Sequence, residues 1–214
     1  MRLDRRGLLR AGLVVAAAGM TITACGSHSP APGPATTSPG ATTSPGAHAS
    51  AAAQLPAGAV GTGCAVLPAT GAGSARAMRA DRVVTALASS PQLTDLARAM
   101  VASGLARRLD RAREMTVLAP DNAAFAALGA GNLQTLMASR RDLAGVLKYH
   151  LVTGRVTPQR LAAARPIDTL LHMPVQPDKS GAAYTVNTAT VICGNIRVAN
   201  ATIYILNKVL IPTR

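Results

Sequence analysis

The chain has few aromatic residues: one phenylalanine, three tyrosines and no tryptophan among its 214 residues. Proteins that bind single-stranded nucleic acid stack bases on aromatic side chains along a basic groove. Phe125, Tyr149, Tyr184 and Tyr204 are not interleaved with the basic residues in that way. The sequence therefore predicts no nucleic-acid partner, although it contains 22 Lys and Arg and only 9 Asp and Glu. Anionic lipid headgroups or acidic wall polymers account better for this positive charge.

Charged residues are absent from positions 11 to 75, directly after an arginine-rich start. Four arginines among the first ten residues precede the apolar segment AGLVVAAAGMTITA. This arrangement is typical of a signal peptide, which we place at 1–24. The apolar segment is shorter than the ~20 residues that a membrane-spanning helix needs. We therefore expect an exported protein. The motif DRRGLLR (4–10) is similar to a twin-arginine signal, and the general secretory route stays open as well.

Cysteine is scarce, and the first of the three cysteines closes the apolar segment. Ile22, Thr23, Ala24 and Cys25 match the lipobox pattern of branched apolar, small, small, cysteine. Cys25 is therefore the predicted lipidation site, which would attach the mature chain to the outer face of the cell membrane; the protein could also be shed or secreted. The alternative is an ordinary secretory signal with an incidental cysteine.

Residues 25–63 are predicted to form a disordered tether. Pro, Ser, Thr, Gly and Ala dominate this segment, and ATTSPGATTSPG (35–46) is a tandem repeat. Such a composition buries too little apolar surface to offset the entropy of ordering. The tether would hold a folded head away from the membrane.

The remainder, 64–214, has the size of one domain. Its first half carries helix signals: Ser90-Pro91, Asn132, Ser139 with Asp142, and Thr157-Pro158 as N-terminal caps. Its second half contains β-branched runs separated by turn residues, namely TLLHMPVQ, AAYTVNT, ATVICGN and ATIYILNKVLIP. Helices followed by strands predict an α+β fold with an antiparallel sheet.

Sequence signatures of catalysis and metal binding are lacking. The chain contains no G-x-S-x-G, no phosphate-binding glycine loop, no dinucleotide fingerprint and no histidine or cysteine pair at metal spacing. We therefore predict a protein that is not an enzyme, with no catalytic residues, no metal and no cofactor. The basic run RRLDRAR (107–113) is interpreted as a solvated helix end rather than a binding patch.

Three stretches in order resemble the fasciclin (FAS1) family. TVLAPDNAAFAAL (116–128) is similar to its first box, VLKYHLVTGRV (146–156) to its central Tyr-His segment, and NIRVANATIYILNKVLIP (195–212) to its second box. The cysteine motifs GTGCAVL and VICGN further resemble secreted actinobacterial fasciclin-domain lipoproteins and antigens. The resemblance implies a single fasciclin domain, an antiparallel β-sheet wedge or sandwich with a helical layer.

The first box is interpreted mainly as a strand-helix corner of the core. Pro120 ends the strand, Asp121 or Asn122 caps the following helix, and Phe125 and Leu128 face inward. The alternative is a partner-binding edge.

The Tyr-His segment supplies the candidate contact residues. Fasciclin Tyr-His segments are associated with receptor binding, so Tyr149 and His150 are possible partner contacts by resemblance. From the residues alone, His150 is expected to be structural, with its side chain hydrogen-bonded to the first box near 116–122.

Cys64 and Cys193 are predicted to form a disulfide. Export places them in an oxidising compartment, and once Cys25 is lipidated only one intramolecular pairing remains. The alternative is two unpaired buried thiols.

Two functional hypotheses follow. The first is a surface-anchored lipoprotein acting in cell adhesion or extracellular protein or matrix binding, with an unidentified surface receptor, wall polymer or matrix protein as partner. The second is an extracellular carrier of a small apolar ligand such as a lipid or pigment. A wall-active hydrolase is a distant third.

Overall fold

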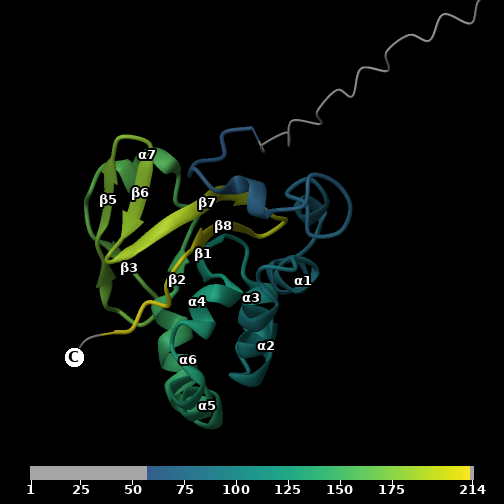
Figure 1. Ribbon diagram of the computed structural model, residues 1–214, viewed down its shortest axis with the longest axis vertical. Helices are drawn as coiled ribbons and strands as arrows, with labels where there is room; N and C mark the ends of the chain where they lie inside the picture. The colour runs from purple at the N-terminus through teal and green to yellow at the C-terminus, as the bar shows by residue number, and fades with distance from the viewer. Residues whose placement is uncertain (1–56, 213–214) are drawn as a thin grey trace, which may run out of the picture. The chain divides into compact units, whose positions relative to one another are not determined.

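Residues 57–212 are described by a computed structural model, drawn as the coloured ribbon in Figure 1. The predicted signal peptide, Cys25 and the predicted tether up to residue 56 lie outside the described residues. The helices are η1 (Cys64–Val66), η2 (Ala77–Ala80), α1 (Val83–Ser89), α2 (Thr94–Ala102), α3 (Ala106–Arg111), α4 (Asn122–Ala126), α5 (Ala130–Ala138), α6 (Arg140–Tyr149) and α7 (Pro158–Ala162).

The strands form a six-stranded sheet and a separate two-stranded ribbon. The sheet has the order β2-β1-β8-β7-β6-β5, and the ribbon pairs β3 with β4. The strands are β1 (Met115–Pro120), β2 (Leu151–Thr153), β3 (Ile167–Asp168), β4 (Pro174–Val175), β5 (Pro177–Ser180), β6 (Ala183–Val186), β7 (Ala189–Arg197) and β8 (Ala201–Leu206). Helices α1 to α6 gather on one side of the sheet in Figure 1, and α7 lies beside β5 and β6. The α+β class is therefore confirmed.

The sheet is mixed, because two adjacent inner strands, β1 and β8, run parallel. β1 pairs with β8 in parallel over its whole length, whereas every other strand pair is antiparallel. Both strands are buried at every residue, as strands covered on both faces are. The long connection from β1 to β8 supplies the crossover that a parallel pair requires. The expected antiparallel sheet is thus interrupted by this parallel pair.

Alternating side-chain directions along β1 and β8 divide the interior into two cores. Odd-numbered residues such as Val117 and Ile203 belong to the core beneath α1 to α6. Even-numbered residues such as Leu118 and Tyr204 belong to a smaller core that includes α7 and the β3-β4 ribbon. Successive side chains of a strand point to opposite faces, so one pair of strands supports both cores.

The helix caps were predicted with mixed success. Ser139 accepts a hydrogen bond from the Asp142 amide at 3.3 Å, and Thr157 accepts one from the Arg160 amide at 3.2 Å. Ser90 instead follows the last residue of α1, and α2 begins only at Thr94. Asn132 lies inside α5, where its amide donates to the Leu128 carbonyl, so it is not a cap.

The run TLLHMPVQ (169–176) is mostly a turn, and only Pro174–Val175 forms a strand, β4. The Thr169 amide and hydroxyl both donate to the Met173 carbonyl, which closes a tight loop between β3 and β4. His172 has φ of 60° and is exposed at this turn. The run was expected to be a strand from its composition and the turn residues around it, but the local side-chain to backbone bonds of Thr169 compete with strand pairing.

Candidate functional site

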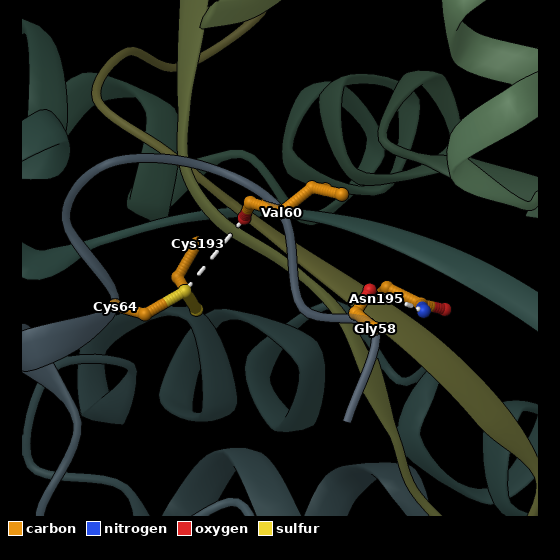
Figure 2. Close-up of a disulfide and its surroundings, with 5 residues drawn as sticks. All are labelled: Gly58, Val60, Cys64, Cys193 and Asn195. Atoms are coloured by element: carbon orange, nitrogen blue, oxygen red, sulfur yellow. Dashed lines mark hydrogen bonds between the residues drawn. A yellow bond between two sulfur atoms is a disulfide. The ribbon is translucent and has the colours of Figure 1, made fainter. Parts of the chain in front are cut away.

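The disulfide between Cys64 and Cys193 fixes the start of the domain to β7. The two sulfurs are bonded at 2.02 Å and the Cα atoms lie 4.6 Å apart (Figure 2). Cys64 precedes the helical layer and Cys193 lies in the second-last strand, at a sequence separation of 129. The bond therefore joins the two ends of the domain.

Residues 58–63 also lie against β7, although the sequence analysis assigned them to the tether. Val60 and Gly194 exchange two backbone hydrogen bonds, and the Gly63 amide donates to the Ile192 carbonyl at 2.9 Å. The Asn195 side chain donates to the Gly58 carbonyl at 2.8 Å (Figure 2). The Val60 carbonyl oxygen also lies 3.7 Å from the Cys64 sulfur. This contact is not a hydrogen bond, because a disulfide sulfur carries no proton. The predicted boundary at residue 63 is therefore several residues too late.

The VICGN motif is the part of β7 that receives this segment. A Cβ at Gly194 would stand 2.3 Å from the Tyr204 ring, so only glycine fits there. Asn195 has φ of 57°, a left-handed conformation that asparagine tolerates better than most residues. The pairing of β7 with β8 shifts register between Cys193 and Ile196. This bulge directs Asn195 to the incoming chain.

The first box forms the strand-helix corner that its residues predicted. β1 ends at Pro120, and the Asp121 carboxylate accepts a hydrogen bond from the Ala124 amide at 2.7 Å. Phe125 is buried beneath the helices. Asn122 does something that its local sequence did not indicate: its side-chain oxygen accepts from the Asp95 amide at 3.1 Å and so caps α2. The first box therefore has a structural role, because Asp121 caps α4 and Asn122 connects α4 to α2.

The Tyr149 and His150 side chains are buried, so the direct partner contact expected from the family resemblance is not available to them. Tyr149 is 5% exposed and His150 is fully buried. The Tyr149 hydroxyl donates to the Pro174 carbonyl at 3.2 Å and accepts from the Asn187 amide at 3.0 Å. Tyr149 thus ties α6 to β4 and to the turn before β7.

His150 has a structural role, but its side chain contacts a different segment from the one predicted. Its Nδ1 lies 2.8 Å from the Val146 carbonyl, and the Leu210 amide donates to Nε2 at 2.9 Å. Only the backbone carbonyl of His150 reaches the first box, where it accepts from the Leu118 amide. The donor to Nε2 therefore lies after β8, near the end of the second box.

These two contacts fix the charge state of His150. Because Nε2 accepts a hydrogen bond from the Leu210 amide, Nδ1 carries the ring proton and donates to the Val146 carbonyl. Burial lowers the pKa of His150 to about 4, against the opposing effect of the Val146 carbonyl. His150 is neutral at physiological pH and is saturated with hydrogen bonds, which leaves it no capacity for a ligand.

A buried asparagine in the second box organises the opposite end of the domain. The Asn200 side-chain oxygen accepts from the Val83 amide at 2.9 Å. Its amide nitrogen donates to the carbonyls of Leu109 at 2.9 Å and Ala112 at 3.1 Å. Asn200 therefore holds the start of α1, the end of α3 and the β7-β8 turn in one place.

Arginines surround this point on the surface. Arg82, Arg107 and Arg111 line one shallow depression with Asp110. Arg79, Arg155 and Arg197 line a second depression with Glu114, Val198 and Ala199. The Ala199 amide donates to the Asp81 carbonyl, so the two depressions share the same supporting backbone. We define the arginine face as these six residues: Arg79, Arg82, Arg107, Arg111, Arg155 and Arg197.

The arginine face has a large excess of positive charge. Six arginines and two acidic residues line the two depressions. Within residues 57–212, only Arg155 of this face has an acidic partner, Glu114 at 3.8 Å. Arg155 is half-buried and donates to the carbonyls of Ala201, Val198 and Ala199, whereas the other five are exposed. Among these five, Arg82 donates to the Asp110 backbone carbonyl, and the other four side chains make no hydrogen bond within residues 57–212. A guanidinium group matches the planar geometry of carboxylate and phosphate groups.

The arginine face was not predicted, because its residues come from four segments that are far apart in the sequence: 79–82, 107–111, 155 and 197. The run RRLDRAR was interpreted as a solvated helix end, and Arg107 and Arg111 of α3 are exposed. Arg82 and Arg197 join Arg107 and Arg111 only after folding. The one signal that pointed to the site was the overall excess of arginine.

The described part of the chain holds neither a metal cluster nor a spanning helix. Within residues 57–212, no three His, Cys, Asp or Glu residues are grouped to hold a metal ion. In the same range, no helix combines the length and apolar character needed to cross a bilayer.

Comparison with known proteins identifies the family. The model of the Fasciclin domain matches residues 91–212, more than half of the chain. The chain belongs to the fasciclin family. The match includes all three boxes, and the resemblance of the chain to the fasciclin family is confirmed.

The fasciclin relatives include mycobacterial surface proteins. The chain is 34% identical over 203 residues to the "Cell surface glycolipoprotein MPB83" of Mycobacterium bovis, covering 91% of this chain and 89% of that protein. It is 35% identical over 161 residues to the "Immunogenic protein MPT70" of Mycobacterium tuberculosis, covering 72% and 82%.

A solved structure supports the fasciclin fold. The FAS1 domain pair from the insect cell adhesion molecule Fasciclin I superposes with a TM-score of 0.53 at 14% identity. The match covers 61% of this chain and 51% of the domain pair, so the chain spans about half of that structure.

Proposed function

We propose that this fasciclin protein is a surface-anchored lipoprotein that acts by binding an acidic partner outside the cell, without catalysis. The observation that carries the proposal is the arginine face, where five exposed arginines have no acidic partner within residues 57–212. Relatives named as cell surface glycolipoproteins support a surface location. The partner would be a wall polymer, a surface receptor or a matrix protein that presents carboxylate or phosphate groups.

The anchor in this proposal is a diacylglycerol thioether on Cys25. Two acyl chains give stable membrane attachment, whereas one chain gives only marginal binding. We expect Cys25→Ser to release the protein from membranes or to leave an unprocessed precursor. Membrane fractionation with palmitate labelling checks this, and a mature-sized, labelled Cys25→Ser protein in the membrane fraction would contradict it.

Retention on immobilised heparin, an acidic polysaccharide, tests the binding surface. The full-length protein in detergent is compared with the double variant Arg107→Glu and Arg111→Glu, which reverses two charges of the arginine face. The double variant Arg141→Glu and Arg165→Glu is the matched control, because both arginines are exposed and line neither depression. We expect the first variant to elute at clearly lower salt than the control, since exposed charges act within a Debye length of about 10 Å at 0.1 M salt. Equal elution of the two variants would contradict the proposal.

A second candidate function is the transport of a small ligand, and one cavity favours it. A cavity of about 390 Å³ lies between α3, α6 and the β3-β4 turn. Its volume falls within the range of small-molecule sites, about 300 to 1,000 Å³. Organic extraction of the purified protein followed by mass spectrometry tests this function, because a carrier would release a stoichiometric lipid or pigment.

A further inference from the structure

The cavity between α3, α6 and the β3-β4 turn combines an apolar interior with a basic rim. Five leucines line it, among them Leu109 and Leu151, which are buried, and Leu171, which is half-buried. The remaining lining residues are Arg108, Lys148 and His172. The leucines offer a surface for hydrocarbon, and the basic side chains come from three different elements.

The basic side chains of the rim have no negative partner. No acidic residue lines the cavity, and neither Arg108 nor Lys148 forms an ion pair with another residue of the 57–212 range. Lys148 is half-buried at the last turn of α6, and its ammonium group makes no hydrogen bond to the described residues. An anion at this rim would form charge-assisted hydrogen bonds with these cationic side chains.

The turn that closes the cavity is held in a sparsely populated backbone conformation. His172 has φ of 60°, in the left-handed region that L-residues seldom adopt. The turn is fixed by the Thr169 bonds to Met173, and the Leu170 amide donates to the Leu151 carbonyl at 2.7 Å. These bonds fix the backbone that places Leu171 and His172 in the cavity lining.

We infer that this cavity binds a small amphipathic anion, with a carboxylate or phosphate headgroup at Lys148 and Arg108 and a short hydrocarbon chain on the leucines. The inference rests on the carrier function proposed above and names its class of ligand.

The groove between α1 and α2 is the main competing site, and its charge differs. It is lined by apolar residues such as Val84, Ala97 and Val101, with Arg98 as its only charged residue. Arg98 already pairs with Asp95 at 3.2 Å. This groove therefore lacks a free cation, and we expect an anionic ligand to choose the cavity beside Lys148.

Calorimetric titration of the full-length protein in detergent with decanoate tests the inference, with decanol as the uncharged comparison. We expect saturable binding of one decanoate per chain and about tenfold weaker binding of decanol, the loss expected for one charge-assisted hydrogen bond. Lys148→Gln removes the charge and keeps most of the side-chain length, and it should weaken decanoate binding by a similar factor. Arg141→Gln is the matched control on the same helix and should leave the affinity unchanged.

The outcomes separate the two proposals. Equal binding of decanoate and decanol would leave a carrier function standing and overturn the selection of an anion. No binding of either would overturn both. A photoreactive decanoate analogue adds the location: crosslinks at 105–109 or 170–173 support the cavity, and crosslinks at 84–102 overturn it.

Discussion

The Tyr-His segment and the arginine face are both rich in polar side chains, yet they differ in how many hydrogen-bonding groups remain free to bind a partner. Tyr149 and His150 are buried and have every strong hydrogen-bonding group satisfied within the fold. Five arginines of the arginine face are exposed and lack an acidic partner in the described range. A group that is already saturated stabilises the fold, whereas an unsatisfied one is available to a partner.

The same comparison separates the supports of the fold from its contact surface. The disulfide, His150 and Asn200 each join segments that are far apart in the sequence. Changes at these residues should lower the free energy of unfolding. Changes at the exposed arginines should alter binding and leave stability nearly intact.

The disulfide should give the largest effect on stability. Cross-linking residues 129 positions apart removes much of the unfolded chain's entropy, which chain-entropy estimates put at about 5 kcal/mol. We expect the double variant Cys64→Ala and Cys193→Ala to lose most of this in urea unfolding. Reduction of the wild-type protein should give the same loss. An unchanged urea midpoint would mean that the hydrogen bonds of 58–63 to β7 suffice to hold the N-terminal segment.

His150 should make stability depend on pH. Its folded pKa of about 4 lies below the ordinary value of 6.5, so the unfolded chain takes up a proton before the folded chain does. The contribution of His150 to the free energy of unfolding is fully present above pH 6.5. It is lost as the pH falls toward 4, by about 3 kcal/mol in total. Urea unfolding at successive pH values measures this loss.

A matched pair of variants isolates the histidine. His150→Gln should be less stable at pH 7 but should lose little more between pH 6.5 and 4. His172→Asn changes the other histidine of the 57–212 range, which is exposed, and should keep the wild-type dependence. A wild-type slope retained in His150→Gln would show that other groups carry the acid sensitivity.

Asn200 links the two sides of the comparison. Its three buried hydrogen bonds are expected to contribute about 2 kcal/mol, which Asn200→Ala would remove. Asn207→Ala is the control, because Asn207 is exposed and makes a single bond to the Thr190 amide. Since Asn200 positions the segments that carry the arginines, its variant should also weaken heparin retention. Loss of stability with full retention would show that the arginines act without this support.

Local sequence signals predicted the parts of the fold that local bonds determine. Asp121, Ser139 and Thr157 cap helices as expected, each through an amide three residues ahead. The two boxes contain β1 and β8, because unbroken β-branched and apolar residues suit a strand buried on both faces.

The features that local sequence patterns did not predict depend on long-range contacts. Asn122 caps α2 across 27 positions, and Asn200 reaches Val83 across 117. Neither asparagine is distinguishable by local pattern from Asn132, which was wrongly expected to be a cap. The arginine face depends on the same tertiary contacts, so its residues could not be grouped before the fold was known.

The smallest effect on stability should come from the arginine face itself, and it provides the sharpest test of the comparison. Arg107 and Arg111 are exposed, and their side chains form no hydrogen bond or ion pair within residues 57–212. Surface substitutions of this kind change stability by no more than about 0.5 kcal/mol. The double variant Arg107→Glu and Arg111→Glu should therefore unfold at the wild-type urea concentration, or at a slightly higher one, because it relieves repulsion among the arginines. A loss of several kcal/mol would show that these arginines support the fold, and the weaker heparin retention expected of this variant would then reflect unfolding and not the loss of a contact surface.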